Sequence, residues 1–365
     1  MATGFTLAMY PWVYTAQYDG DDSWDERFIE KPHKTPAEEE ALAPAEREQL
    51  LASRNSFPEL PLVNYTTQYG LGCFEGLKAF PQKDGSLKVF RPDENAKRMY
   101  NSMVGLNMPG YPHEMFVNAV RTVVKRNRDL GFYPRYDAAW EKKGYLDGHS
   151  MYIRPFSYAE PGIGLNLSRK PWVVIVTTPV GSYFDPEASA KAITTDKVRA
   201  FPGGTGWIKC DANYVVPILV KKEAEKNGYM EAVFLDATEK KYVEEGSSCN
   251  IFFYLKSGTL VTPQLDDTVL PGINRKSAIE IARSHGVPVE ERKVTIDEVM
   301  ADAKEVFVTG TAAGIAYIES LEHKGRTAVF GDRTMGELTH DILMTLKGIQ
   351  YGAVDDTFGW MFDVE

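Results

Sequence analysis

Hydrophobic residues follow helical spacing in some stretches of the chain and form short uninterrupted runs in others. In residues 113–130 the valines recur three and four positions apart and Gly131 follows, which predicts an amphipathic helix that ends at the glycine. The short apolar runs at residues 151–157 and 172–178 predict buried strands. Helices and strands are therefore mixed in the first half of the chain.

The second half has the same mixture of patterns. Helices are predicted at residues 213–227 and 274–285, each followed by a glycine, and a short helix is predicted after Thr295. Strands are predicted at residues 232–235, 251–255 and 305–308. The irregular order of the two element types predicts an α+β or mixed α/β fold and not a doubly wound parallel sheet.

A change of pattern at residues 179–188 marks the predicted domain boundary. This stretch contains two prolines and a glycine but little apolar periodicity, so it is predicted to be an interdomain linker. It separates a smaller N-terminal α/β domain, residues 1–178, from a larger C-terminal domain, residues 189–365.

The first domain is predicted to carry an acidic surface extension at residues 17–55. Within it, Thr35 and Glu38 have the spacing of a capping box and Pro36 occupies the first helical position, so a helix is expected to begin there. The residues of the extension indicate no function of their own.

Composition limits the classes of function that are open to the chain. With 365 residues, of which 43% are hydrophobic, it is long enough for two folded domains. The formal net charge of −10 argues against nucleic acid or an anionic membrane surface as the main partner, although one local pocket can still hold a phosphate. No apolar run approaches the roughly 20 residues of a membrane span, and the first basic residue is Arg27, so a cytoplasmic location is expected.

Cysteine and histidine usage favours neither a disulfide framework nor a metal site. The three cysteines are too few and odd in number, and the six histidines are scattered without a close pair. No bound metal is therefore expected. We interpret Cys73, Cys210 and Cys249 as small buried side chains.

Two glycine-rich stretches resemble nucleotide-binding motifs without matching them. Residues 70–76 carry three glycines, but the spacing is one residue too long for the dinucleotide fingerprint and no strand–helix–strand unit follows. Residues 203–206 precede a lysine but lack the phosphate-loop spacing and its Lys-Ser/Thr pair. A plain nucleotide-binding enzyme is therefore a weak alternative.

Two ionisable residues lie in apolar surroundings. Lys209 follows Trp207 and Ile208, and a lysine desolvated in this way becomes a usable amine nucleophile, although a surface lysine at a helix start has the same local pattern. Glu245 precedes a strongly apolar strand, where a carboxylate could hold a pyridinium proton, and a solvated loop acid is the alternative.

Two further stretches are suited to binding anions. Tyr152 and Arg154 fall on the same side of a strand by its period of two and would form a carboxylate clamp, unless they form a strand-edge salt bridge. The turn at residues 270–275 leads into a helix N-terminus, whose free N–H groups favour an anion, although an ordinary loop-to-helix junction has the same sequence.

From residue 62 to the end, the order of these stretches resembles the branched-chain amino-acid aminotransferases, which are fold-type IV, class-IV enzymes dependent on pyridoxal 5′-phosphate. The resemblance implies a two-domain fold with the cofactor lysine in the C-terminal domain. Seven blocks carry it, at residues 69–78, 90–98, 152–155, 203–214, 242–250, 270–273 and 309–313.

The resemblance also implies roles for individual residues. Lys209 corresponds to the catalytic lysine that forms the Schiff base, Tyr214 to the partner of the cofactor's phenolic oxygen, and Glu245 to the partner of its pyridine nitrogen. The phosphate would be bound by Arg91, Ile273, Asn274 and Thr311. The substrate would be bound by Tyr69, Phe74, Tyr152, Arg154, Thr311 and Ala312.

The implied reaction is reversible transamination of L-leucine, L-isoleucine and L-valine with 2-oxoglutarate, in a homodimer or larger homo-oligomer. The alternatives within the fold are a D-amino-acid aminotransferase and an aminodeoxychorismate lyase, and outside it a cofactor-free binding protein. The chain departs from the family at Asp211 and Ala212, where a glycine pair is common.

Overall fold

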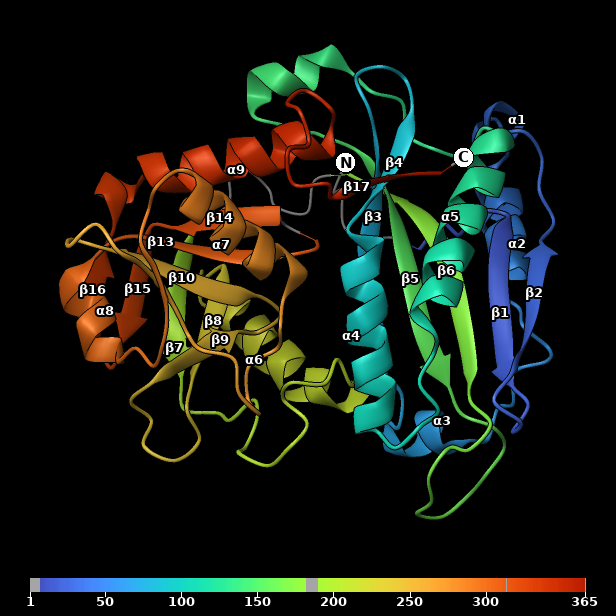
Figure 1. Cartoon of the computed structure of the whole chain (residues 1–365), viewed down its shortest axis with the longest axis horizontal. Helices are drawn as coiled ribbons and strands as arrows, with labels where there is room; N and C mark the ends of the chain where they lie inside the picture. Colours follow the sequence, from blue (N-terminus) through green and yellow to red (C-terminus); the bar gives the residue numbers. More distant parts are fainter. Residues whose placement is uncertain (1–6, 182–189, 313, 365) are drawn as a thin grey trace. The chain divides into compact units, whose positions relative to one another are not determined.

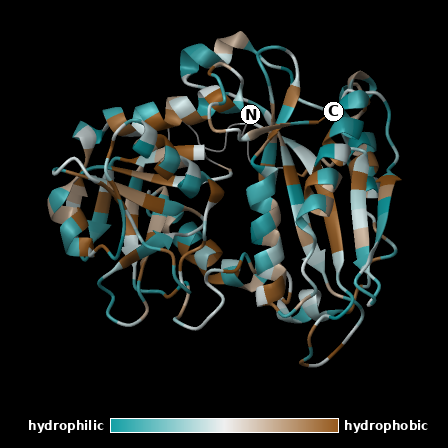
Figure 2. Ribbon diagram, viewed as in Figure 1, coloured by the Kyte–Doolittle hydropathy of each residue, from teal (hydrophilic) through white to brown (hydrophobic). Residues whose placement is uncertain are grey.

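The computed structural model describes residues 7–181, 190–312 and 314–364. The chain divides into two compact units (Figure 1). The first consists of Met1–Tyr183, Cys210–Ala212 and Ile349–Glu365, and the second of Phe184–Lys209 and Asn213–Gly348. Hydrophobic residues concentrate on the strands of both units (Figure 2).

The first unit is built on an antiparallel sheet of seven strands in the order β17-β4-β3-β5-β6-β1-β2. The strands are β1 (Trp12–Tyr18), β2 (Trp24–Glu30), β3 (Leu77–Pro81), β4 (Leu87–Phe90), β5 (Ser150–Tyr158), β6 (Trp172–Val180) and β17 (Met361–Asp363). The helices are α1 (Pro36–Glu40), α2 (Pro44–Arg54), α3 (Tyr65–Tyr69), α4 (Pro92–Gly105), α5 (His113–Asp129) and the 3-10 helix η1 (Ala138–Lys143).

Helix α5 confirms the prediction made from valine spacing. Its valines Val120, Val123 and Val124 are buried, and the helix packs on β1 and β6. Gly131, just beyond the helix, has a φ of +87°, a backbone conformation that glycine adopts without strain.

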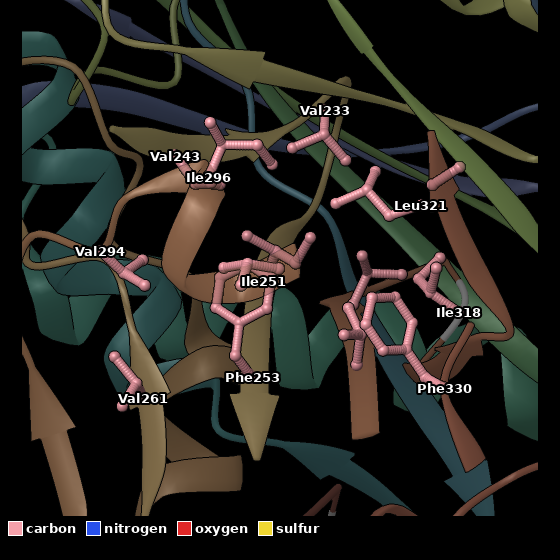
Figure 3. Close-up of a cluster of buried hydrophobic side chains, with 14 of the residues drawn as sticks. Val233, Val243, Ile251, Phe253, Val261, Val294, Ile296, Ile318, Leu321 and Phe330 are labelled. Atoms are coloured by element: carbon pink, nitrogen blue, oxygen red, sulfur yellow. The ribbon is translucent and has the colours of Figure 1, made fainter. Parts of the chain in front are cut away.

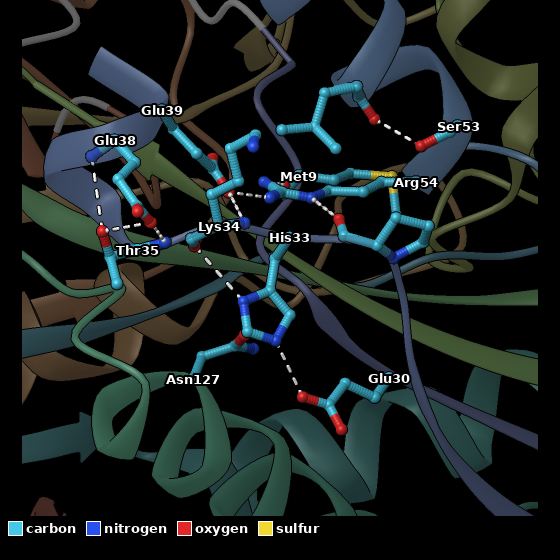
Figure 4. Close-up of polar contacts among 12 residues, drawn as sticks. Met9, Glu30, His33, Lys34, Thr35, Glu38, Glu39, Ser53, Arg54 and Asn127 are labelled. Carbon is cyan, nitrogen blue, oxygen red and sulfur yellow. Dashed lines mark hydrogen bonds and ion pairs between the residues drawn. The ribbon is translucent and has the colours of Figure 1, made fainter. Parts of the chain in front are cut away.

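The N-terminal extension is anchored in the first unit. Strand β2 of the extension pairs with β1 of the sheet, and the predicted capping box of α1 is present. The buried Arg54 side chain forms an ion pair with Glu39 and donates a hydrogen bond to the carbonyl of Met9 (Figure 4). The interpretation of this stretch as a surface addition is therefore incomplete, because part of it belongs to the core.

The second unit contains two sheets of five strands, in the orders β12-β11-β10-β13-β14 and β16-β15-β7-β8-β9. Their strands are β7 (Lys191–Thr195), β8 (Glu231–Leu235), β9 (Val243–Gly246), β10 (Asn250–Leu255), β11 (Leu260–Thr262), β12 (Val289–Glu291), β13 (Ala303–Gly310), β14 (Gly314–Ile318), β15 (Ser320–His323) and β16 (Arg326–Val329). The helices of this unit are α6 (Val215–Lys226), α7 (Ile273–Ser284), α8 (Ile296–Asp302) and η3 (Gly331–Arg333). Two more, η2 (Asp211–Tyr214) and α9 (Glu337–Gln350), have residues in both units.

Apolar side chains from both sheets and from α8 form the core of the second unit. Ile251 and Phe253 of β10 lie in this cluster with Val233 of β8, Ile296 of α8 and Leu321 of β15 (Figure 3). Figure 3 shows these side chains pointing toward one another. The mixture of helices with parallel and antiparallel pairs agrees with the predicted α+β class.

The units differ from the predicted domains at the C-terminus. Residues 349–365 belong to the first unit because β17 pairs antiparallel with β4. The two strands lie far apart in the sequence, so no local pattern predicts this pairing. With these residues the first unit is the larger of the two, whereas the second was expected to be larger. Most of the predicted linker, residues 182–188, lies outside the described residues.

Candidate functional site

In the second unit, Lys209 lies at the end of the glycine-rich loop and its amine is held by a tyrosine. Lys209 Nζ donates a hydrogen bond to the hydroxyl oxygen of Tyr214 at 2.7 Å. The Asn213 side chain fastens the loop because its amide donates to the carbonyls of Thr205, at 2.7 Å, and Ile208, at 2.9 Å. The lysine is partly buried, which favours the amine-nucleophile interpretation over a surface lysine.

Glu245 is a buried carboxylate with three polar partners. It belongs to β9 and is 4% exposed. One carboxylate oxygen pairs with Nη2 of Arg199 at 2.8 Å, and the other accepts from Nδ2 of Asn250 at 2.9 Å and from the Leu270 N–H at 3.2 Å. Burial raises the pKa of this carboxyl to about 7, against a smaller lowering by the Arg199 charge. The solvated-acid alternative is therefore excluded.

Arg199 is a site residue that the sequence analysis missed. Besides Glu245, its guanidinium donates to the carbonyls of Gly206, at 3.1 Å, and Thr268. It thereby ties the carboxylate of β9 to the loop that carries Lys209. Its position between Val198 and Ala200, just before the glycine-rich loop, was the only local signal, and an arginine in such a place is not distinctive.

The N-terminus of α7 lies next to the Glu245 cluster. Gly272 is the N-cap and provides no side chain, so the first N–H groups of the helix have no side-chain cap. A side chain at Gly272 would overlap Oδ1 of Asn250, the same residue that binds Glu245. Nδ2 of Asn274 donates to the carbonyl of Gly310 at 2.9 Å, which fixes the start of α7 to the end of β13.

The helix dipole and the free N–H groups at this end of α7 are suited to an anion such as a phosphate. Ile273 and Asn274 form the first turn and are 8% and 7% exposed. Thr311 and Ala312 follow β13 directly, beyond the carbonyl that Asn274 contacts. The structure thus brings Glu245, Ile273, Asn274, Thr311 and Ala312 to neighbouring places around β9, β13 and α7.

In the first unit, Phe74, Tyr152 and Arg154 form a cluster that we call the Arg154 cluster. Nη2 of Arg154 donates to the Tyr152 hydroxyl at 2.8 Å, as the period of two along β5 predicts. The guanidinium carbon lies 4.7 Å from the centre of the Phe74 ring and 5.2 Å from that of Tyr152. The Tyr152 hydroxyl lies over Gly76, where a Cβ atom would overlap it.

A buried ion pair beneath this cluster was also missed. Glu75 is fully buried, and Arg98 donates to both of its oxygens at 2.7 Å, while Nδ2 of Asn95 donates to Oε2 at 2.7 Å. This bidentate pair fixes the segment after Phe74 to helix α4. Both residues lie in stretches that the sequence analysis had singled out, but their separation of 23 positions hides the contact.

The remaining predicted residues of the first unit lie elsewhere in it. Arg91 is the buried N-cap of α4 with a φ of 46°, and its guanidinium carbon lies 4.8 Å from the centre of the Trp360 ring. Tyr69 is 44% exposed and its hydroxyl accepts a hydrogen bond from the Gly164 N–H at 3.1 Å. In the described part of the chain, no group of three or more His, Cys, Asp or Glu residues is placed to hold a metal ion.

Comparison with known proteins places these residues in a family context. The model of the amino-transferase class IV family matches residues 72–321. Branched-chain-amino-acid transaminase 1 of Bacillus subtilis is 39% identical over 305 residues, which cover 81% of this chain and 82% of the relative. Branched-chain-amino-acid aminotransferase 5, chloroplastic, of Arabidopsis thaliana is 39% identical over 295 residues, which cover 80% of this chain and 68% of the relative.

Solved structures of branched-chain aminotransferases also superpose on the chain. The branched-chain amino acid aminotransferase of Escherichia coli superposes with a TM-score of 0.71 at 27% identity, over 84% of this chain and 94% of that one. The branched-chain aminotransferase of the thermophilic archaeon Thermoproteus uzoniensis, solved with norvaline, superposes with a TM-score of 0.71 at 29% identity, also over 84% of this chain and 94% of that one.

Proposed function

The chain belongs to the class IV aminotransferases and, within them, to the branched-chain-amino-acid aminotransferases, and we propose that it transfers amino groups by means of pyridoxal phosphate bound at Lys209. The reaction is transamination of branched-chain amino acids, and we propose 2-oxoglutarate and L-glutamate as the second substrate pair. The observation that carries the proposal is the buried Glu245, held by Arg199 and Asn250 in the same unit as the Lys209 amine.

The residues of the second unit fit pyridoxal phosphate in charge and in hydrogen-bonding capacity. The cofactor has an aldehyde, a pyridine nitrogen and a phosphate, which call for an amine, a carboxylate and an anion site. Lys209 offers the amine, Glu245 the carboxylate, and the uncapped N-terminus of α7 the anion site. A Cβ at Gly272 would overlap Asn250, so a side chain there would disturb both of the last two features.

When bound, the cofactor supplies an electron sink for the carbanion formed at the substrate's Cα. Glu245, once ionised, would hold a proton on the pyridine nitrogen and so favour the uptake of electrons by the ring. Lys209 would offer the free amine that takes up the proton from the substrate's Cα and returns it. Tyr214, already hydrogen-bonded to Nζ, orients this amine.

We propose the following roles for the remaining predicted residues. Arg154, with the Tyr152 hydroxyl, would bind the acidic side chain of glutamate, while Phe74 offers an apolar surface for leucine. The Thr311–Ala312 stretch after β13 would bind the α-carboxylate. Arg91, together with Ile273, Asn274 and Thr311, would bind the phosphate. Tyr69 completes the proposed set.

We also propose that the chain forms a homodimer or a larger homo-oligomer in the cytoplasm. Val215, Ile218 and Leu219 form an apolar stripe on α6 and are 59%, 56% and 66% exposed, as expected for a contact surface. The three cysteines are free, which suits a reducing compartment. Among the described residues, no helix has the length and apolar character of a membrane span. Light scattering on the purified protein tests the assembly, and a monomer would contradict it.

The function is tested by assaying the purified protein with added pyridoxal phosphate and 2-oxoglutarate. L-Leucine, L-isoleucine and L-valine should each yield L-glutamate, and D-alanine should not. Activity with D-alanine alone would favour the D-amino-acid aminotransferase alternative. Absence of glutamate formation with all four amino acids would contradict the proposal.

A further inference from the structure

Asp211, two positions after the proposed cofactor lysine, is held in the first unit. Cys210 and Cys73 pair as an antiparallel bridge, and the Asp211 N–H donates to the Gly72 carbonyl at 3.0 Å. The carboxyl group is therefore attached to the segment that precedes Phe74. This contact gives Asp211 a fixed place among the residues of the first unit.

The glycines at positions 70 and 72 make room for this contact. A Cβ atom at Gly72 would overlap Oδ2 of Asp211, and one at Gly70 would lie 3.0 Å from the Cβ of Ala212. The glycine pattern that resembled a nucleotide-binding motif thus has another physical use. It allows residues 210–212 to lie directly on the backbone of residues 70–72.

The charged partner of Asp211 is Arg154. Burial raises the pKa of the Asp211 carboxyl to about 6, and the positive charge of Arg154 opposes that rise. The other titratable groups on the adjoining segment are neutral or paired. Burial raises the pKa of the Cys73 thiol, which keeps it protonated, and Glu75 is paired with Arg98.

Asp211 and Arg154 influence each other without direct contact. Among the described residues, no ion pair within 4.0 Å joins the two side chains, whereas Glu245 and Arg199 form one at 2.8 Å. Arg154 is half-buried, and the hydrogen bond of its guanidinium in the described structure runs from Nη2 to the Tyr152 hydroxyl. The guanidinium therefore retains donors for a ligand anion, and a carboxylate of this chain competes electrostatically for its charge.

We propose that Asp211 is a specificity-determining residue, which, when ionised, weakens the binding of amino acids with acidic side chains at Arg154 and leaves aliphatic ones unaffected. This inference rests on the proposed function, because it takes the Arg154 cluster as the place of the substrate side chain. Its physical basis is repulsion between the ionised Asp211 and an acidic side chain bound at Arg154. A leucine side chain carries no charge and feels no such repulsion.

The repulsion should depend on pH. A glutamate side chain, with an ordinary pKa of about 4.3, remains ionised above pH 5.5. Asp211, in contrast, gains its proton as the pH falls through about 6. The KM for glutamate divided by the KM for leucine should therefore rise from pH 5.5 to pH 8, and taking this ratio cancels effects common to both substrates.

The experiment measures both KM values from pH 5.5 to 8.5 for the wild-type holoenzyme, Asp211→Asn and Asp211→Gly. In the wild type we expect the ratio to rise about five- to tenfold, as for a repulsion of roughly one pKa unit. In both variants it should stay at its low-pH value throughout, with the KM for leucine within about twofold of wild type. A variant ratio that rises with pH as in the wild type would overturn the inference.

The wild-type measurement alone keeps the inference falsifiable if the variants fold poorly, because a ratio that is constant from pH 5.5 to 8.5 also overturns it. Failure of the proposed function has a different signature. A wild-type protein that converts neither leucine nor glutamate would contradict the transaminase assignment itself, whereas normal activity with a constant ratio contradicts only the role of Asp211.

Discussion

Glu245 in the second unit and Asp211 in the first are both carboxylates whose pKa is raised by burial and opposed by an arginine, to about 7 and about 6. They differ in whether the carboxylate touches its arginine. Glu245 touches Arg199 at 2.8 Å and accepts two more hydrogen bonds, whereas Asp211 has no ion pair with Arg154 within 4.0 Å among the described residues.

This difference suits the two carboxylates to two different functions. A carboxylate with every partner in place is held in one position and suits a task common to all substrates, which is to keep a bound pyridine ring protonated. A carboxylate separated from its arginine leaves the arginine available to a ligand. Such an arrangement suits a site that must accept an acidic side chain in one half-reaction and an aliphatic one in the other.

Among the four variants, Glu245→Gln should reduce the activity most. Loss of the negative charge leaves the pyridine proton and Arg199 uncompensated, so we expect kcat/KM to fall about 10²- to 10³-fold, and by the same factor for leucine and glutamate. Steady-state kinetics with both substrates checks this. A loss confined to one substrate would place Glu245 on the substrate side and remove the contrast with Asp211.

Arg154→Leu should reduce kcat/KM for glutamate far more than for leucine. The variant removes the guanidinium but keeps apolar bulk, so kcat/KM for glutamate should fall about 30- to 100-fold, the equivalent of a lost charged hydrogen bond of about 2–3 kcal/mol. Leucine should change less than about threefold. Lys83→Leu, which removes an exposed cation of the same unit, is the matched control and should change neither value. Equal losses with both substrates would contradict the assignment of Arg154.

Arg199→Gln should move the pH profile. Arg199 lowers the pKa of Glu245, so its removal raises that pKa above about 7, and the ionised form is then lost over a wider acidic range. The acidic limb of kcat/KM should shift upward by about one pH unit, a loss of about tenfold well below pH 7 and of about fivefold at pH 7. Arg199→Lys retains the charge and should shift the limb less. An unmoved limb in the glutamine variant would show that Arg199 does not set the ionisation of Glu245.

Tyr214→Phe should have the smallest effect. It removes the hydroxyl that accepts from Lys209 Nζ at 2.7 Å but keeps the ring, so we expect kcat to fall about fivefold, as for one hydrogen bond of about 1 kcal/mol. The visible spectrum of the holoenzyme should also shift, because the lysine loses a partner. A kcat and a spectrum identical to wild type would show that the hydroxyl plays no part.

Much of the fold and of the site was predictable because it depends on local pattern. Helix α5 follows from valine spacing, the cap of α1 from Thr35 and Glu38, and Lys209 and Glu245 from the motifs that contain them. In each case the informative residues lie within a few positions of one another. The contact of Tyr152 with Arg154 follows from the period of a strand in the same way.

The parts that were missed depend on contacts between distant positions. Arg199 gains its role only when it meets Thr268, 69 positions away, and Glu245 of β9. Strand β2 has a mostly exposed and polar sequence, and only pairing with β1 makes it a strand. Asp211 stood out as a departure from the family, but the sequence gives no sign that Arg154 is its neighbour.

The most direct test of the account is to identify the lysine that holds the cofactor. The purified protein is incubated with pyridoxal phosphate, reduced with borohydride, digested and analysed by mass spectrometry, with Lys209→Ala treated in parallel. We predict a yellow protein before reduction, a single phosphopyridoxyl group on the peptide that contains Lys209, and neither in the variant. A label on another lysine, or a wild-type protein that takes up no cofactor, would contradict it.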